Sequence, residues 1–256
     1  MPHHRRGSRR CRVLGSLVGA LQPQAEEGSS HDGAATTFRA LVTRMEGKVG
    51  VAELTELASA PHPQPDDADI TVRVRYSNIN YKDGMVLGGM PGVAKAFPIV
   101  AGIDAAGEVV EAPANGRFAV GDKVCLTGGY AGQHFCGGFS QLARLRSADL
   151  VPLPPAFTLA ESMAIGTAGF TAMQSIMHLE EAGNLESRKA EGPVLVTGAA
   201  GGVGSVAVAL LSSLGYTVVA SSGRADTLGE RGLPCQIHVV YIPGRGVCIL
   251  ICHPSL

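Results

Sequence analysis

A glycine-rich segment in the second half of the chain limits the possible fold more than any other feature. Residues 194–204 read VLVTGAAGGVG, an apolar run that breaks into glycines, and residues 205–214 continue as a helix-forming stretch. A strand, a tight glycine turn and a helix N-terminus in this order are typical of nucleotide-binding α/β domains. Glycine permits the turn and lets backbone N–H groups approach a pyrophosphate. A glycine turn without a ligand is the alternative.

The spacing Gly198-x-x-Gly201-Gly202-x-Gly204 is related to G-x-G-x-x-G without matching it literally. A second apolar run at residues 216–222 stands where the next strand of a βαβ unit belongs. Together, the two runs and the glycine turn between them indicate a dinucleotide-binding unit. The expected cofactor-binding residues of the loop are Gly198, Ala200, Gly201, Gly202 and Val203.

The end of the second run indicates which dinucleotide is bound. An NAD-binding unit usually carries Asp or Glu there, whereas this chain has Ser222, Gly223 and Arg224. A guanidinium and hydroxyl groups suit a 2′-phosphate, because they donate charge-assisted hydrogen bonds to its oxygens. We therefore predict NADPH as the cofactor. Asp226 is the alternative partner for a ribose if the strand ends later.

Five blocks together carry a resemblance to a known family: NYKD at 80–83, GIDAAG at 102–107, GTAGFTAM at 166–173, TGAAGGVG at 197–204 and SGR at 222–224. In order and spacing they resemble the acrylyl-CoA reductase branch of the quinone oxidoreductase-like, medium-chain dehydrogenase/reductase superfamily, over roughly residues 38–226. The resemblance implies a GroES-like β domain followed by a Rossmann domain.

The same resemblance implies an activity and a set of site residues. It implies zinc-independent, NADPH-dependent reduction of the C=C bond of an enoyl thioester such as acryloyl-CoA. It places Asn80, Tyr81 and Thr167 near the nicotinamide and the substrate, but it identifies no proton donor. Because dimers are common in this superfamily, the resemblance also allows a homodimer.

The chain divides into four predicted segments. Residues 1–36 form an extension, residues 37–155 the GroES-like domain, residues 156–230 a linking helix with the first half of the Rossmann domain, and residues 231–256 a tail outside the family pattern. Five arginines precede any acidic residue in the extension, as in an organellar transit peptide, although a disordered extension explains them equally well. Cytoplasm and mitochondrial or plastid matrix therefore both remain open.

Local patterns predict the elements of the first half. Residues 38–42, 70–76, 106–110 and 123–126 are apolar or alternating over strand lengths. Thr158 and Glu161 have the spacing of a capping box, so a helix is expected to start there.

Composition and cysteine positions exclude several classes of protein. The chain has a formal net charge of -1 and 45% hydrophobic residues, which argues against a nucleic-acid partner. No apolar run is long enough for a transmembrane helix, and six scattered cysteines suggest a reducing compartment. Ile103 stands where zinc-containing relatives have the histidine of a Gly-His-Glu block, so no metal is predicted. Cys248, Cys252 and His253 are too few ligands for a site.

The tail differs in composition from the rest of the chain. Residues 231–256 contain no Asp, Glu or Lys and include an apolar run at 247–252 that would favour aggregation as an unpaired strand. Because the resemblance stops near Asp226, a truncated isoform is one interpretation. Three functions stay open: an active enoyl-thioester reductase, an inactive remnant that binds nucleotide or pairs with full-length subunits, and an NADPH quinone reductase.

Overall fold

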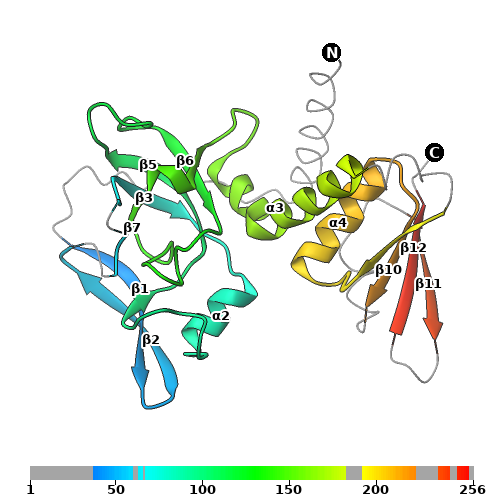
Figure 1. Ribbon diagram of the computed structural model, residues 1–256, viewed down its shortest axis with the longest axis horizontal. Coiled ribbons are helices and arrows are strands. Elements are labelled where there is room, and N and C mark those ends of the chain that lie inside the picture. The colour runs from blue at the N-terminus through cyan, green and yellow to red at the C-terminus, as the bar shows by residue number, and fades with distance from the viewer. Residues whose placement is uncertain are drawn as a thin grey trace. The chain divides into compact units, whose positions relative to one another are not determined.

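The computed structural model describes residues 37–59, 63–65, 67–182 and 192–222, and the backbone of two strands at 236–242 and 247–253. The described residues form two compact units, the first ending at Thr167 and the second beginning at Ala168 (Figure 1). The division between the two units falls within a long helix.

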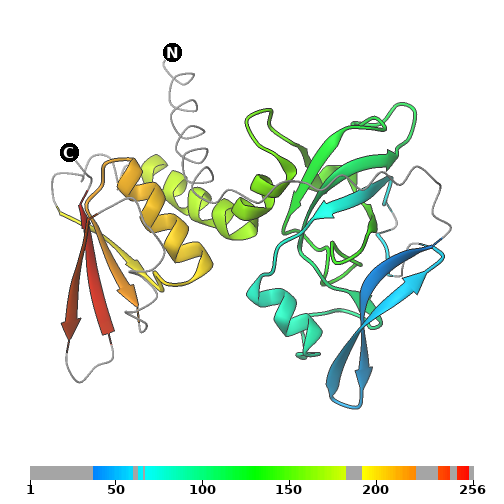
Figure 2. The ribbon, with the colours of Figure 1, turned by 180° about the vertical axis from the view of Figure 1, so that it is seen from behind.

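Two antiparallel sheets build the first unit (Figures 1 and 2). One has five strands in the order β7-β3-β5-β6-β8, and the other has the order β2-β1-β4. Their bounds are β1 Phe38–Glu46, β2 Val49–Leu57, β3 Ile70–Tyr76, β4 Ile99–Val100, β5 Asp104–Glu111, β6 Lys123–Thr127, β7 Leu142–Leu145 and β8 Leu150–Pro152. The four predicted strands are therefore confirmed as β1, β3, β5 and β6.

Alternating apolar residues explain why these strands pack as they do. Val72 of β3 lies opposite Val109 of β5, and both are almost completely buried. They share a core with Ile70 of β3 and with Val124 and Leu126 of β6. Burial of such side chains stabilises each by roughly 1.5–3 kcal/mol, so the sheet face fixes the register.

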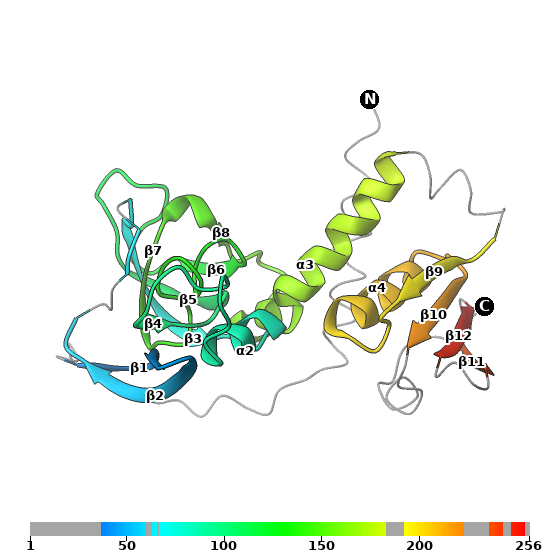
Figure 3. The ribbon, with the colours of Figure 1, turned by 60° about the horizontal axis from the view of Figure 1, so that its bottom comes forward.

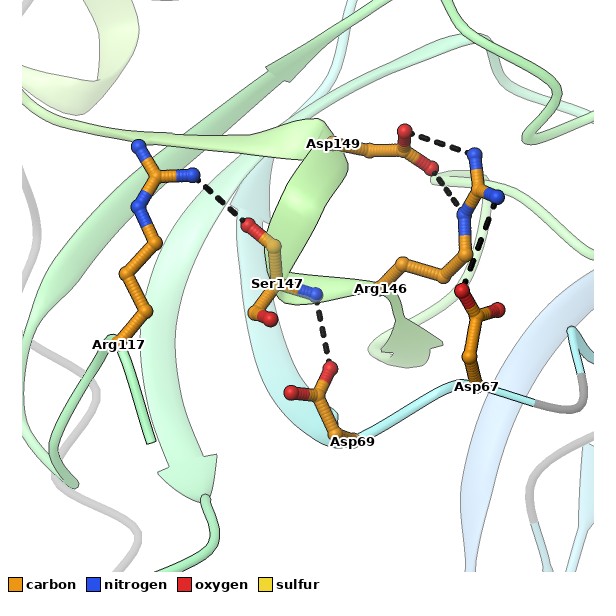
Figure 4. A network of polar contacts seen from close by, with 6 residues as sticks. All are labelled: Asp67, Asp69, Arg117, Arg146, Ser147 and Asp149. Atoms are coloured by element: carbon orange, nitrogen blue, oxygen red, sulfur yellow. Dashed lines mark hydrogen bonds and ion pairs between the residues drawn. The ribbon is translucent and has the colours of Figure 1, made fainter. Parts of the chain in front are cut away.

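Polar contacts attach the segment before β3 to the 3₁₀ turn η1 (Ser147–Asp149) (Figure 4). The Asp149 carboxylate accepts two hydrogen bonds from Arg146, at 2.7 and 2.8 Å, and Asp67 forms an ion pair with Arg146 at 3.8 Å. Asp69 accepts a hydrogen bond of 2.8 Å from the backbone N–H of Ser147. These contacts hold the segment before β3 next to η1, which leads directly into β8.

Two helices accompany the first unit. The short helix α2 spans Tyr81–Leu87, and α3 spans Leu159–Glu181, of which the part up to Thr167 belongs to this unit. Thr158 and Glu161 exchange hydrogen bonds of 2.7 and 3.2 Å, which confirms the predicted capping box at the start of α3. Helix α2 was not predicted from the sequence.

The second unit contains a βαβ arrangement (Figure 3). Strands β9 (Val194–Thr197) and β10 (Val218–Ser222) are parallel, and α4 (Gly202–Ser213) connects them. Apolar residues of α3, α4 and both strands form one core that includes Ala172, Val208 and Tyr216. The parallel strands with a helical crossover form the predicted Rossmann-type half.

A hairpin extends this sheet to the order β11-β12-β10-β9. Strand β12 (Val247–His253) pairs antiparallel with β10 on one side and with β11 (Gln236–Ile242) on the other. The apolar run at 247–252 is therefore a strand, as its composition suggested, but it is paired on both edges. Among the described residues, no helix has the length and hydrophobicity needed to cross a membrane.

Candidate active site and nucleotide-binding loop

The buried carboxylate of Asp104 joins three separate segments of the first unit. Its Oδ2 atom accepts hydrogen bonds from Asn80 Nδ2 at 2.9 Å and from the backbone N–H of Thr167 at 2.8 Å. Its Oδ1 atom accepts from the backbone N–H of Gly128 at 3.1 Å and from the Thr167 hydroxyl. Asp104 is fully buried, so these four donors supply the hydrogen bonds that its oxygens would otherwise accept from water.

Gly166 allows the chain to pass close to this carboxylate. Its backbone has φ 48° and ψ -163°, which interrupts α3 and is open mainly to glycine. A Cβ atom at this position would lie 2.0 Å from Asn78 Nδ2 and 2.8 Å from Asp104 Oδ2. Glycine is therefore required both by the conformation and by the space, and it delivers Thr167 to Asp104.

A second buried carboxylate, Asp83, lies in the first turn of α2. Its oxygens accept hydrogen bonds from the backbone N–H groups of Asn80 at 2.7 Å and Ile103 at 3.0 Å. Burial raises the pKa of the Asp83 carboxyl, and the nearby Asp104 charge adds to the rise against these donors. Asp83 thus fixes the start of α2 to the segment before β5.

The three predicted pocket residues differ from one another in burial and in contacts. Asn80 and Thr167 are half-buried, and Asp104 brings them together. Tyr81 begins α2 with 86% of its surface exposed. Asp104 was missed as a site residue, although an aspartate at the head of an apolar strand is a signal for a carboxylate that the fold must satisfy.

The glycine loop of the second unit exposes backbone at the start of α4. Gly198 has a left-handed φ of 62°, and Gly201 is the N-cap of the helix. At Gly204 a Cβ atom would lie 2.3 Å from the Gly198 carbonyl oxygen. The absence of a side chain at Gly204 lets the first helical turn pack directly on the loop, as the spacing predicts.

The N-terminus of α4 is chemically suited to an anion. The first N–H groups of a helix have no acceptor within it and carry the positive end of the dipole. Gly201 provides no capping side chain, and no acidic residue stands in the first turn of α4. Helices α2 and α3, in contrast, each have an acidic first-turn residue that accepts a backbone hydrogen bond at its own start. The donors of α4 are thus available to an external phosphate.

The predicted cofactor residues occupy different positions around this loop. Gly202 and Val203 are exposed in the first turn, whereas Ala200 is buried in the core, so only its backbone could contact a ligand. Ser222 is buried at the end of β10. Gly223 and Arg224 lie outside the described residues.

No cluster of three or more His, Cys, Asp or Glu side chains arranged to hold a metal occurs within the described ranges. Ile103, at the position where zinc-containing relatives have histidine, is buried with 2% exposure. Cys248, Cys252 and His253 belong to β12, for which the backbone alone is described.

Comparison with known proteins agrees with both halves of this description. The model of the alcohol dehydrogenase GroES-like domain matches residues 66–155. The acrylyl-CoA reductase AcuI of Ruegeria pomeroyi is 51% identical over 159 residues, which are 62% of this chain and 47% of the relative. Other relatives are named quinone oxidoreductases or their homologues.

Solved structures show the same architecture with dinucleotides bound. The yhdH oxidoreductase of Salmonella enterica, in complex with NADP, has a TM-score of 0.69 at 42% identity, covering 75% of this chain and 57% of that one. The yhfP protein of Bacillus subtilis, with NAD bound, also has a TM-score of 0.69, at 39% identity, covering 77% of this chain and 58% of that one.

The matched residues and the two folded units define a chain with a GroES-like part and a Rossmann-type part. The chain belongs to the quinone oxidoreductase-like, medium-chain dehydrogenase/reductase superfamily, in its acrylyl-CoA reductase branch. It spans about half the length of the curated relatives it matches.

Proposed function

We propose that this protein is an NADPH-dependent reductase of the C=C bond in α,β-unsaturated acyl thioesters of the acryloyl-CoA type. The main support is the N-terminus of α4, which has no capping side chain, in a chain that is 51% identical over 159 residues to a named acrylyl-CoA reductase. Two similar solved structures contain bound NADP or NADPH.

The pyrophosphate of the cofactor would bind at the glycine loop. Gly198, Gly201 and Gly202 leave room for it, and the N–H groups of the first helical turn, including that of Val203, would donate to its oxygens. The helix dipole adds an attraction of about 0.3–1 kcal/mol for each charge near an exposed terminus. Ala200 would take part through its backbone.

The choice between NADPH and NADH would depend on the end of β10. Ser222, Gly223 and Arg224 form a segment without an acidic residue, so a 2′-phosphate would meet hydroxyl and guanidinium donors rather than a repelling carboxylate. The yhfP structure contains NAD, so a preference for NADH is the alternative outcome. We therefore propose NADPH as the preferred cofactor.

NADPH, when bound, supplies a hydride to the β-carbon of the enoyl thioester, and a proton then adds at the α-carbon of the resulting enolate. The chain's own residues have the task of placing the reacting groups. Asn80 and Thr167, held by Asp104, and the exposed Tyr81 are proposed to line the nicotinamide and substrate end.

The quinone oxidoreductase names of other relatives support a second candidate, reduction of a quinone with NADPH. Steady-state oxidation of NADPH by the purified chain, with acryloyl-CoA and with a quinone in parallel, distinguishes the two. A larger kcat/KM for acryloyl-CoA supports the proposal, whereas a larger value for the quinone replaces it. Binding of NADPH without turnover of either substrate would indicate an inactive nucleotide-binding form.

A homodimer would be tested by sedimentation of the same preparation. Co-expression with a full-length relative would show whether the chain pairs with such a subunit. Fusion of residues 1–36 to a fluorescent protein would separate a cytoplasmic location from an organellar matrix.

A further inference from the structure

Strand β2 forms one edge of the smaller sheet of the first unit, whose order is β2-β1-β4. In Figures 1 and 2, its hairpin with β1 extends away from the five-stranded sheet. An edge strand offers a row of backbone donors and acceptors to any further strand. Proteins usually limit such pairing with very short edge strands, with charged residues such as lysine, or with proline.

The edge strands of the first unit differ in this protection. Strands β4, β7 and β8 have two, four and three residues, and the last two include Arg144 and Pro152. Strand β2 has nine residues and contains no lysine, arginine or proline. Two of its apolar side chains, Val49 and Leu54, are 61% and 64% exposed. Among the edge strands that the structure describes in this unit, β2 is therefore the one suited to pairing with a further strand.

Neighbouring hydrogen bonds show which backbone groups of β2 face outward. In an antiparallel pair, alternate residues direct their N–H and C=O groups away from the partner strand. Gly50 donates its N–H to the Gly88 carbonyl oxygen at 3.2 Å, so it faces away from β1. Leu41 of β1, opposite Leu54, donates to the Phe139 carbonyl oxygen and thus also faces away from its pair. The outward-facing residues after Gly50 are Ala52, Leu54 and Glu56. Within the described residues, no backbone hydrogen bond uses their outward groups.

The contact at Gly50 limits how far a further strand can pair. A Cβ atom at Gly50 would lie 2.4 Å from the Leu87 carbonyl oxygen, so the end of α2 covers this part of the edge. The remaining part runs from Val51 to Leu57, and its midpoint is Leu54. A two-fold axis at Leu54 would let two copies of the chain exchange hydrogen bonds through their outward-facing residues. In this register Leu54 lies opposite its own copy, and Val51 lies opposite Leu57 of the second copy.

The acidic residues of β2 are compatible with this register. Glu53 lies opposite Thr55 of the second copy, and Glu56 lies opposite Ala52, so no two like charges face each other directly. Glu53, the acidic residue nearest to the axis, forms an ion pair with Arg44 of its own chain at 3.6 Å. This pairing lowers the repulsion between the two copies of Glu53.

We propose that the outer edge of β2 pairs antiparallel with the same edge of a second copy of this chain, with the two-fold axis at Leu54. The sheets of the two copies then form one continuous sheet. The interface is small, which is typical of weak association, so we expect a dissociation constant of about 10–100 µM. The reductase function proposed above does not depend on this pairing.

Two lysine substitutions at exposed positions of β2 test the register. In Leu54→Lys the new charge lies opposite its own copy and the apolar contact is lost, so dimerisation should weaken at least tenfold. In Ala52→Lys the new ammonium lies opposite Glu56 of the second copy, so dimerisation should strengthen about threefold. Both variants add the same charge to the same face of one strand, and each is therefore the control for the other.

Sedimentation velocity of the full chain and of both variants, from about 1 to 200 µM, measures the dissociation constants. Weaker dimerisation of Leu54→Lys with stronger dimerisation of Ala52→Lys supports the inference. A wild type that stays monomeric at the highest concentration, or a dimer on which both variants act alike, overturns it. If Leu54→Lys does not fold, Ala52→Pro decides, because it removes an outward N–H while leaving the ladder with β1 intact, and it should weaken dimerisation about tenfold.

Titration of the same preparations with NADPH reports separately on the proposed function. A monomer that binds NADPH overturns the dimer and leaves the proposed function intact. A dimer with the expected response to both lysines that binds no NADPH overturns the proposed function and supports the interface.

Discussion

The Asp104 cluster and the glycine loop differ in how their polar groups are satisfied. Around Asp104, backbone and side-chain donors from three segments are tied together by four hydrogen bonds to one buried carboxylate. At the loop, Gly201 offers no capping side chain to the first N–H groups of α4, and no acidic residue stands in the first turn. The polar groups of the first region therefore satisfy one another, whereas the second has no side chain of its own at the helix start to accept from the backbone.

This difference determines how each region fails. Loss of an acceptor in the Asp104 cluster leaves several buried donors without partners, which costs folding free energy. Addition of a side chain in the loop fills the space that a phosphate would use, which costs binding. The predictions below separate these two effects, beginning with the largest.

Asp104→Ala should lower the free energy of unfolding by about 4 kcal/mol, because four donors lose their buried acceptor together. Urea denaturation followed by circular dichroism measures this loss. The control Asp122→Ala, at an exposed turn, should cost about 1 kcal/mol. Equal losses for the two variants would show that Asp104 does not hold the cluster together.

Gly166→Ala should cost about 3 kcal/mol, from the unfavourable backbone angles and from the contact with Asn78. Gly92→Ala is a matched control, since Gly92 also has a positive φ, of 80°, but a Cβ atom there would meet nothing within 4 Å. It should cost about 1–2 kcal/mol, the backbone effect alone. Thermal unfolding of both variants under one condition reveals whether close packing adds to the strain.

Gly204→Ala should cost about 2 kcal/mol of stability and weaken NADPH binding at least tenfold, because the new Cβ pushes the Gly198 carbonyl out of the loop. In Gly202→Ala the new Cβ would lie 3.3 Å from Ala168 Cβ, a milder contact, so its stability should change by less than about 1 kcal/mol. A Gly204→Ala variant that binds NADPH like the wild type would contradict the proposed loop contact.

Arg224→Ala should reduce the preference for NADPH over NADH about tenfold, the effect of a lost charge-assisted hydrogen bond, while NADH affinity stays constant. Fluorescence titration with both cofactors gives the two dissociation constants. Arg117→Ala serves as a control for lost surface charge, because Arg117 lies in the first unit and donates to the Ser147 carbonyl oxygen. An equal loss of NADH affinity in Arg224→Ala would argue for a general effect on the loop.

The smallest effect concerns pH. The folded pKa of Asp83 is raised above its ordinary value of 3.8, chiefly by burial, so its stabilising contribution is full below that pH and is lost as pH rises through the folded pKa. The stability of the wild type relative to Asp83→Asn should therefore fall across this window and then level off. Urea midpoints measured from about pH 3 to pH 7 follow the change.

The pKa of Asp69 is shifted in the opposite direction to that of Asp83, so the stability should change with pH in the opposite sense. Burial opposes ionisation of this carboxyl, but hydrogen bonds from Ser147 and the charge of Arg144 outweigh it and lower the pKa. Its contribution is present above pH 3.8 and is lost as pH falls through the folded pKa. Parallel slopes for Asp83→Asn and Asp69→Asn would refute the assignment of opposite shifts.

The contrast between the two regions also explains what the sequence could predict. The glycine loop and the capping box of α3 involve residues within a few positions of one another, so local spacing was sufficient to predict both. The partners of Asp104 lie 24 and 63 positions away in the sequence. Their proximity arises from the folded sheet and the break at Gly166, and no local pattern encodes it.

The unpredicted elements have similar causes. Strand β4 has two residues and is defined by its pairing with β1. Helix α2 has seven residues and includes Gly84, which disfavours a helix, while buried Asp83 anchors its first turn. Hairpin strand β11 forms by pairing with β12, which in turn pairs with β10. Tertiary contacts override weak local preferences in each case.

Titration of the purified wild-type chain with NADPH and NADH, followed by nicotinamide fluorescence, tests the central claim most directly. The account predicts saturable binding in the micromolar range that is tighter for NADPH and is lost or strongly weakened in Gly204→Ala. Folded protein, verified by circular dichroism, that shows no saturable binding of either cofactor would contradict it.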